Sequence, residues 1–104
     1  MGDRKMAYVK GRVYFMVSYL DEDGVVPTME TVVYLGEERQ EDNEIRHIFQ
    51  DYESWRDLGA YPNNEEGTGK VFALPSSELS NILTYEGAVA ELSGCIPRRK
   101  ARGL

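Results

Sequence analysis

The feature that most constrains the fold is a run of β-branched and aromatic residues from Arg12 to Leu20. Side chains along an extended strand point alternately to its two faces, so a half-buried strand repeats its apolar residues with a period of two. One face of this run is apolar or aromatic throughout and comprises Val13, Phe15, Val17 and Tyr19. We therefore expect the run to be a β-strand.

The residues that follow predict a β-hairpin. The sequence Asp-Glu-Asp-Gly at 21–24 has turn chemistry, because its glycine takes a positive φ without steric cost. The next extended run, residues 28–35, follows Pro27, which cannot donate to a ladder and so belongs at the strand's entrance or on an edge. Gly36 is expected to end this strand, and the polar residues 37–43 are expected to form an exposed connection.

Residues 44–58 allow two interpretations. In the first, they form one amphipathic helix that begins after Asp42 and ends at Gly59. In the second, residues 45–50 form a third strand, Asp51 is an N-cap and only residues 52–58 are helical. We favour the second, because a hairpin alone makes too small a sheet. The helical spacing behind the first comes from Ile45, Ile48, Phe49, Tyr52 and Trp55.

The C-terminal part predicts a loop, a strand and a helix. Residues 61–69 are rich in turn formers, and the apolar run at 70–74 is typical of a central strand. A serine N-cap after Pro75 and an acid at Glu78 predict a helix start there, and Gly94 is expected to end this helix. A break at Gly87 would divide it in two. Its apolar positions are Leu79, Ile82, Leu83, Val89, Ala90 and Leu92.

These elements predict an α+β fold. A chain of 104 residues is long enough for one modest core. We expect a single domain over residues 1–97, with a small, mainly antiparallel sheet of three to four strands and a C-terminal helix packed on one face. Residues 98–104, which carry Arg98, Arg99, Lys100 and Arg102, are expected to form a flexible basic tail.

Charge is concentrated in the middle of the chain. The segment from Asp21 to Glu66 contains fourteen acidic residues and three arginines, which gives a net charge of −11. An acidic surface of this kind speeds encounter with a basic partner, and exposed aromatic residues are enriched at interfaces. We therefore expect a non-enzymatic interaction module, inhibitor-like or adaptor-like, whose partner is a basic protein. Its candidate binding residues are Glu37, Glu38, Glu41, Asp42, Tyr52 and Trp55.

Two further expectations concern assembly and an alternative function. Both faces of the first strand carry apolar residues, more than one or two short helices can cover, so a second copy of the chain is expected as a partner. The alternative to an interaction module is a small-molecule binding or enzymatic domain with an aromatic pocket. Its candidate lining residues are His47, Tyr34, Trp55 and Tyr61.

Several site types are disfavoured. One histidine and one cysteine, Cys95, are too few for a zinc site, and no nucleophile accompanies His47, so we expect no metal, no cofactor and no catalytic residue. The glycines near Lys70 lack the spacing of a phosphate loop. The acidic body opposes binding of nucleic acid.

The expected compartment is the cytoplasm. A single cysteine forms no internal disulfide, and the first residues show no apolar signal sequence. No apolar run is long enough for a membrane span, so no membrane partner is expected.

Overall fold

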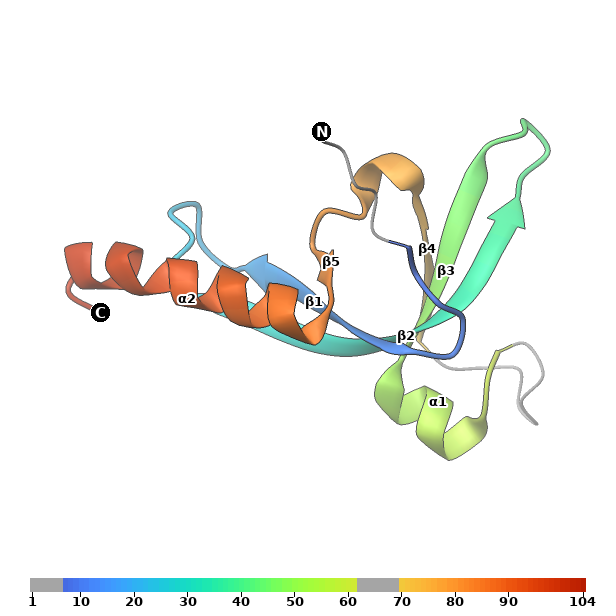
Figure 1. The fold of residues 1–104 in the computed structure, drawn as a ribbon, viewed down its shortest axis with the longest axis horizontal. Coiled ribbons are helices and arrows are strands. Elements are labelled where there is room, and N and C mark those ends of the chain that lie inside the picture. Colours follow the sequence, from blue (N-terminus) through green and yellow to red (C-terminus); the bar gives the residue numbers. More distant parts are fainter. Residues whose placement is uncertain (1–6, 62–69) are drawn as a thin grey trace.

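The computed structural model describes residues 7–61 and 70–104. These residues form one antiparallel sheet with the strand order β4-β3-β2-β1-β5, two α-helices and a short 3₁₀ turn, η1 (Figure 1). The α+β class is confirmed, but the sheet has five strands rather than three to four. The elements are β1 Val13–Tyr19, β2 Pro27–Arg39, β3 Ile45–Asp51, α1 Tyr52–Leu58, β4 Val71–Pro75, η1 Ser76–Glu78, β5 Ile82–Leu83 and α2 Tyr85–Ala101.

The N-terminal hairpin forms as expected. β1 pairs with β2 from Val13 opposite Val33 to Tyr19 opposite Pro27, so the proline lies at the entrance of its strand. In the turn, the Asp21 carboxylate accepts hydrogen bonds from the backbone N–H groups of Val25 and Val26. These two N–H groups thus find their acceptor within the turn itself, so the turn can be identified from its own sequence.

β2 does not end at Gly36, which corrects the expected boundary. The strand continues to Arg39, and its register shifts between Tyr34 and Gly36. Gly36 adopts φ 121°, a conformation that glycine accepts readily, so a β-bulge forms where a break was expected. Pairing with β3 on the far side of the bulge, up to Arg39 opposite Ile45, holds the extension in place.

The second interpretation of residues 44–58 is confirmed. β3 spans Ile45–Asp51 and α1 follows at once. The Asp51 side chain accepts a hydrogen bond from the backbone N–H of Ser54, which caps the first turn. At the other end, Gly59 takes φ 87° and its N–H donates to the carbonyl of Trp55.

β4 lies at an edge of the sheet, not at its centre. Among the described strands it pairs only with β3, although both of its faces carry apolar residues. The apolar run reflects packing against the core, which Phe72 and Leu74 contact, whereas Ala73 is exposed. Phe72, for example, stacks on Phe49 of β3 with ring centroids 5.5 Å apart.

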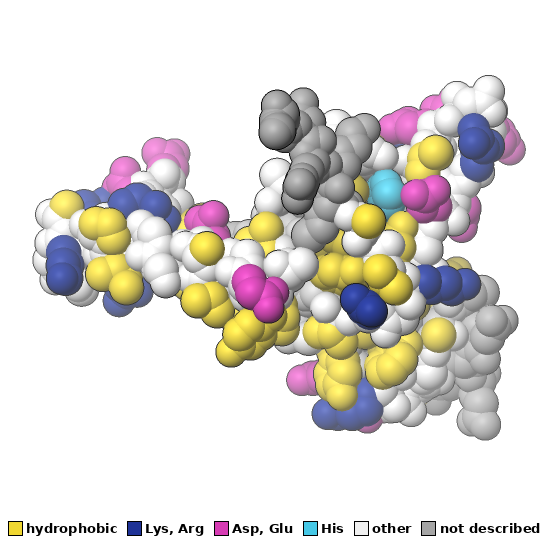
Figure 2. All heavy atoms as spheres, in the orientation of Figure 1, with side chains coloured by type: hydrophobic (Ala, Val, Ile, Leu, Met, Phe, Trp, Pro, Cys, Tyr) yellow, Lys and Arg dark blue, Asp and Glu magenta, His cyan; other side chains and the backbone are white. Residues whose placement is uncertain are grey.

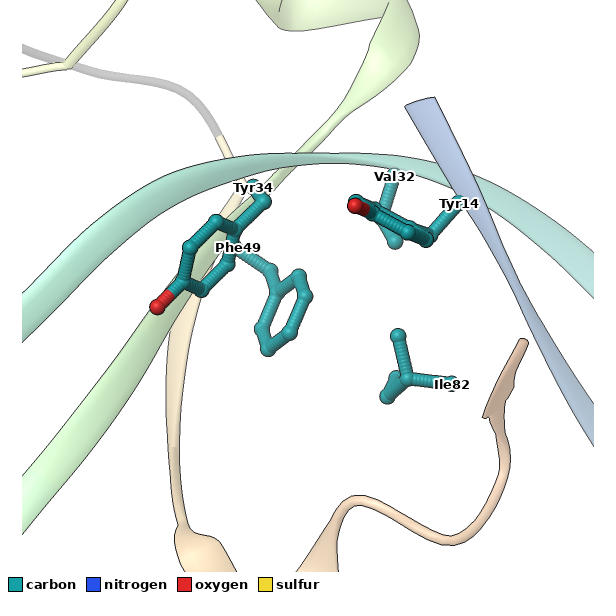
Figure 3. Packing of buried hydrophobic residues seen from close by; sticks show 5 residues of the cluster. All are labelled: Tyr14, Val32, Tyr34, Phe49 and Ile82. Atoms are coloured by element: carbon teal, nitrogen blue, oxygen red, sulfur yellow. The ribbon is translucent and has the colours of Figure 1, made fainter. Parts of the chain in front are cut away.

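The hydrophobic core lies on the concave face of the sheet (Figure 3). Tyr14 and Val32 sit opposite each other across β1 and β2, and Tyr34 sits opposite Phe49 across β2 and β3, so their side chains share one face. Figure 3 shows Ile82 of β5 pointing toward the same interior. All five side chains are at most 5% exposed.

The helix expected to begin after Pro75 and end at Gly94, whole or divided at Gly87, does not form at its first part. Instead the chain makes η1, then β5, and begins α2 at Tyr85. The Thr84 side chain accepts a hydrogen bond from the N–H of Gly87, so the helix cap lies eight residues later than expected for Ser76. Burial of Ile82 in the core, where it pairs with Met16, favours an extended chain at the place where a helix was expected.

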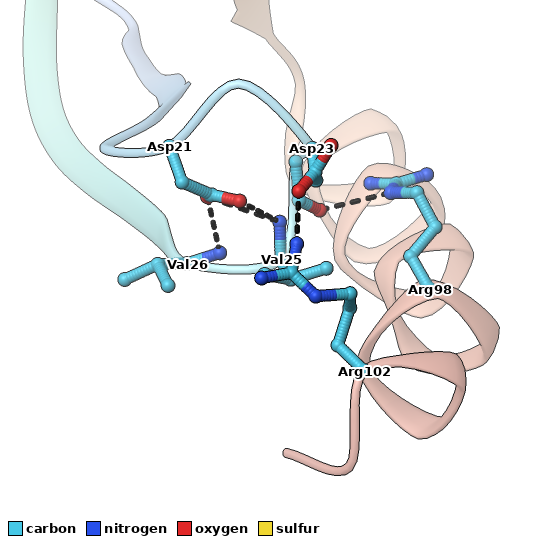
Figure 4. Close-up of polar contacts among 7 residues, drawn as sticks. Asp21, Asp23, Val25, Val26, Arg98 and Arg102 are labelled. Carbon is cyan, nitrogen blue, oxygen red and sulfur yellow. Dashed lines mark hydrogen bonds and ion pairs between the residues drawn. The ribbon is translucent and has the colours of Figure 1, made fainter.

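α2 runs past Gly94 and includes most of the residues assigned to a tail. It ends at Ala101, and Gly103, with φ 75°, follows it where a glycine commonly closes a helix. The expected flexible tail from residue 98 is therefore largely helical. Its basic side chains bind the β1–β2 turn: Arg98 donates to the carbonyl of Gly24 at 2.9 Å, and Arg102 pairs with Asp23 (Figure 4).

α2 packs on the face of β1 opposite the core, as expected for a C-terminal helix that covers one face. Tyr85 contacts Phe15, and both Glu91 and Arg98 bind the hydroxyl of Tyr19. Phe15 and Tyr19 alternate with the core residue Tyr14, which places them on the other side of the strand. Only Ala88 and Cys95 of α2 are fully buried.

Candidate functional site

A groove of about 660 Å³ opens beside the core, between the β2–β3 hairpin and the segment from η1 to β5. It lies on the concave face, because Tyr34, His47 and Ile82 all belong to that face. Apolar and aromatic side chains make most of its wall, and a few polar groups lie among them, which is typical of a binding site. Its lining includes Tyr8, Tyr34, Glu37, Ile45, His47, Ser76 and Leu79.

His47 connects two hydroxyl groups across this groove. Its Nδ1 lies 3.0 Å from the hydroxyl of Tyr34, and its Nε2 lies 3.0 Å from Oγ of Ser76. Burial, with smaller contributions from Glu37 and Tyr14, raises the pKa of Tyr34, so its phenol stays neutral. No carboxylate hydrogen-bonds the imidazole in the described residues. The arrangement thus resembles a fixed polar contact for a ligand more than an activated nucleophile.

Tyr8 fixes the opposite wall of the groove. Its hydroxyl donates to the carbonyls of Leu79 and Ile82, at 3.2 Å and 2.9 Å. Burial, with contributions from Tyr14 and Tyr34, raises the pKa of Tyr8 to about 12. A neutral phenol at this place joins the segment before β1 to the segment before α2, so the groove is formed by parts of the chain far apart in sequence.

The four acidic residues expected to bind a partner lie together on the β2–β3 hairpin. Residues 37–46, which we call the acidic hairpin, project from the body of the molecule (Figure 1). All four acids are exposed, and Glu37 also lines the groove. Figure 2 shows acidic side chains of this hairpin near the one histidine. Arg39 and Arg46 reduce the local charge, and Arg46 pairs with Glu44 at 3.6 Å.

Tyr52 and Trp55, the two aromatic residues of the same expected surface, lie elsewhere. They belong to α1, which follows the end of β3 remote from the hairpin turn (Figure 1). The acidic residues lie toward the hairpin turn, where Glu37 is opposite His47, whereas α1 begins beyond the other end of β3. The expected partner-binding set is thus divided between two surfaces.

The alternative pocket is likewise only half assembled. His47 and Tyr34 meet in the groove, whereas Trp55 and Tyr61 are not among its lining residues. The buried side chain of Gln50 explains this separation: it donates to the carbonyl of Gly59 and accepts from the N–H of Tyr61. Because Gln50 points to the face opposite its neighbour Phe49, the α1 region is held away from the groove.

Sequence reasoning missed most of the residues that line the groove, among them Tyr8, Ser76 and Leu79. Tyr8 precedes the first strand in a segment without periodicity, and Leu79 was placed on a helix. Ser76 was considered only as a helix cap. These residues meet in the groove through contacts between positions that are 29 to 74 residues apart in the sequence. No local sequence pattern reveals such contacts.

The described residues hold no cluster of three or more histidine, cysteine, aspartate or glutamate side chains able to bind a metal ion. Within the same residues, no helix has the length and apolar character needed to cross a membrane. The loop examined for phosphate binding lies almost wholly at 62–69, outside the described residues. Comparisons of the chain with protein-family models, with curated proteins and with solved structures find no match.

Proposed function

We propose that the protein is a non-enzymatic interaction module that binds a segment of a basic protein partner in the groove, guided by the acidic hairpin. The observation that carries this proposal is the position of Glu37. Its side chain belongs to the acidic hairpin and also lines the groove, so the charged surface and the apolar cavity are continuous.

The groove supports recognition of an apolar anchor. Tyr8, Ile45 and Leu79 offer apolar surface in a cavity of about 660 Å³, enough for one or two side chains of a partner. Burial of such an anchor in a preformed pocket is a common origin of hot-spot binding energy. The bonds from Tyr8 to Leu79 and Ile82 keep the pocket formed before the partner arrives.

The acidic hairpin supports selection of a basic partner. Residues 37–46 carry five acids and two arginines, a net charge of −3. Such a field raises the association rate of a cationic segment and falls off as salt increases. A partner segment with a lysine or arginine next to an apolar anchor would place its cation near Glu37 while the anchor enters the groove.

A second candidate, binding of a small molecule in the same groove, is favoured by the chain from Tyr34 through His47 to Ser76. Its two 3.0 Å contacts hold the imidazole in one orientation. An exposed hydroxyl at Ser76 is then a fixed donor or acceptor at the mouth of the groove. This candidate requires no charge on the hairpin.

The test compares charge-reversed variants in affinity capture from lysate. Glu37→Lys with Glu38→Lys changes the acidic hairpin beside the groove. Glu22→Lys with Glu53→Lys makes the same change of net charge on exposed residues elsewhere and is the matched control. We expect a captured basic protein to be lost from the hairpin variant, retained by the control and released by high salt.

A further variant separates the two candidates. Ile45→Gln makes the groove polar and keeps every charge, so it should weaken capture of the basic protein as well. Capture that survives both the hairpin and the groove variants would contradict the proposal. If the hairpin variant has no effect but a small-molecule screen finds thermal stabilisation that His47→Ala abolishes, the second candidate is correct.

A further inference from the structure

α2 carries an apolar stripe that its own domain covers only in part. Tyr85, Val89 and Ile96 are 68%, 49% and 52% exposed, and Leu92 between them is half-buried. We call these four residues the α2 stripe. Hydrophobic side chains line the face of α2 that Figure 2 presents to the viewer. Exposed apolar residues that follow one another along a single helix face are candidates for an interaction surface.

The spacing of the α2 stripe is that of a coiled-coil seam. Its members are separated by four, three and four residues, the alternation of a and d positions in a heptad. At about 100° per residue they fall within about 60° of one another around the helix. The buried residues Ala88 and Cys95 border the stripe on one side, toward the sheet. The free border on the other side consists of Glu86, Ser93 and Lys100.

We propose that the α2 stripe binds the α2 stripe of a second copy of this chain, with the two helices antiparallel. We place the two-fold axis near Ser93, a register in which Leu92 of each copy packs beside Ile96 of the other. This surface is separate from the groove and the acidic hairpin. The inference therefore does not depend on the proposed function.

Charge complementarity identifies the second copy and its direction. The two-fold axis that brings Ser93 beside its own copy also brings Glu86 of each chain beside Lys100 of the other, since the two residues are equally distant from Ser93. Within the described residues neither side chain has an ion pair. Two intermolecular pairs thus form from groups that have no such partner in the monomer.

A parallel arrangement is opposed by the same charges. Arg98, Arg99, Lys100 and Arg102 gather in the last turns of α2, and Figure 2 shows basic side chains at that end of the helix. Parallel helices would bring two such clusters side by side, and like charges at an interface are unfavourable. Antiparallel helices place each cluster near the end that carries Glu86 of the other copy.

The test is a charge exchange in the full-length chain, followed by sedimentation equilibrium. Glu86→Lys and Lys100→Glu each replace two attractive pairs by two repulsive ones, so each should raise the dimer Kd about tenfold, or about 1.4 kcal/mol. The double variant E86K/K100E restores opposite charges and should return the Kd close to that of the original chain. A structural defect in either single variant would not be repaired in this way.

Disruption of the seam gives the second readout. Val89→Asp with Ile96→Asp should yield monomer at every concentration. Leu20→Asp, which changes a residue that is 75% exposed and does not belong to the stripe, should leave the dimer intact. Circular dichroism would check that each variant is folded. A chain that stays monomeric up to about 1 mM, or a dimer that survives both aspartates, would overturn the proposal.

Cross-linking tests the direction of the helices. A short bis-maleimide should join two copies of a Ser93→Cys variant, because the two-fold axis brings this position close to itself. Ala90→Cys lies on the other side of the helix and should not be joined. The native thiol of Cys95 is buried, so the unmodified chain is the control. Cross-linking at Ala90 but not at Ser93 would exclude the antiparallel dimer proposed here.

Discussion

The Nδ1 atom of His47 lies 3.0 Å from the hydroxyl of Tyr34, on adjacent strands and on the buried side of the groove. The two residues are both less than 10% exposed, so each satisfies a polar group of the other that water does not readily reach. This pair connects the hydrophobic core to the polar part of the groove.

Tyr34→Phe removes the hydroxyl and leaves the buried Nδ1 of His47 without this partner. We expect the free energy of unfolding to fall by about 1–3 kcal/mol, the cost of an unsatisfied buried group. Urea denaturation followed by circular dichroism measures it. Tyr61→Phe, at a residue 41% exposed, is the matched control and should change stability by no more than about 0.5 kcal/mol. Equal effects of the two variants would contradict the prediction.

The raised pKa of Tyr8 predicts that the protein loses stability at alkaline pH. Its pKa is about 12 in the fold and 10.0 in the unfolded chain, so between these values the unfolded state binds fewer protons than the native state. Stability that is fully present below pH 10 is therefore lost as the pH rises toward 12. Tyr8→Phe should be less stable near neutral pH, because two hydrogen bonds disappear, yet it should show a smaller alkaline decline. Denaturation at a series of pH values tests this, and an unchanged decline would refute it.

A side chain at Gly24 is expected to clash with Arg98 of α2. Gly24 and Gly11 both have positive φ, at 69° and 85°, but a Cβ at Gly24 would lie 3.2 Å from Nε of Arg98, whereas the space at Gly11 is open. Gly24→Ala should therefore cost about 1–2 kcal/mol more than Gly11→Ala, since it also disturbs the bond from Arg98 to the turn. Thermal denaturation gives both values. In an Arg98→Ala background the difference should disappear, and its persistence would show that Arg98 is not the cause.

The lowered pKa of Asp51, the N-cap of α1, predicts that the protein loses stability in acid. Burial by itself raises the pKa of this carboxyl, but hydrogen bonds from Ser54 together with smaller contributions from Lys70 outweigh it and lower the pKa below 3.8. A lowered folded pKa stabilises the protein above the unfolded value, and that contribution is lost as the pH falls through the folded pKa. Asp51→Asn keeps a capping side chain without titration, so its acid decline should be shallower. Asp51→Ala should cost about 0.5–2 kcal/mol at neutral pH. Identical acid profiles for the original chain and Asp51→Asn would rule out this role.

Local chemistry in the sequence predicts several elements correctly. The alternation along 13–19 identifies β1 and its two faces, because the period of a strand needs no distant partner to be visible. Asp51 and Gly59 delimit α1 for the same reason: a cap and a positive-φ glycine act on their own backbone neighbours. The turn closed by Asp21 is a third example.

The errors occur where a distant contact outweighs a local signal. Gly36 is a plausible strand end, but pairing with β3 carries the strand across it as a bulge. Gly94 is a plausible helix end, but α2 continues to the β1–β2 turn, where Arg98 binds Gly24. The helix expected from Ser76 gives way to β5, because Ile82 is needed in the core.

The sequence by itself determined the class of the fold, the hairpin, the end of α1 at Gly59 and the concentration of acidic residues on one segment. Only the tertiary structure decided which of those residues border the groove and which aromatic side chains line it. The physical reason is the range of the interactions. Alternation, caps and turns act over a few residues, whereas the groove depends on bonds such as that from Tyr8 to Ile82, which are 74 residues apart and leave no periodic trace in the chain.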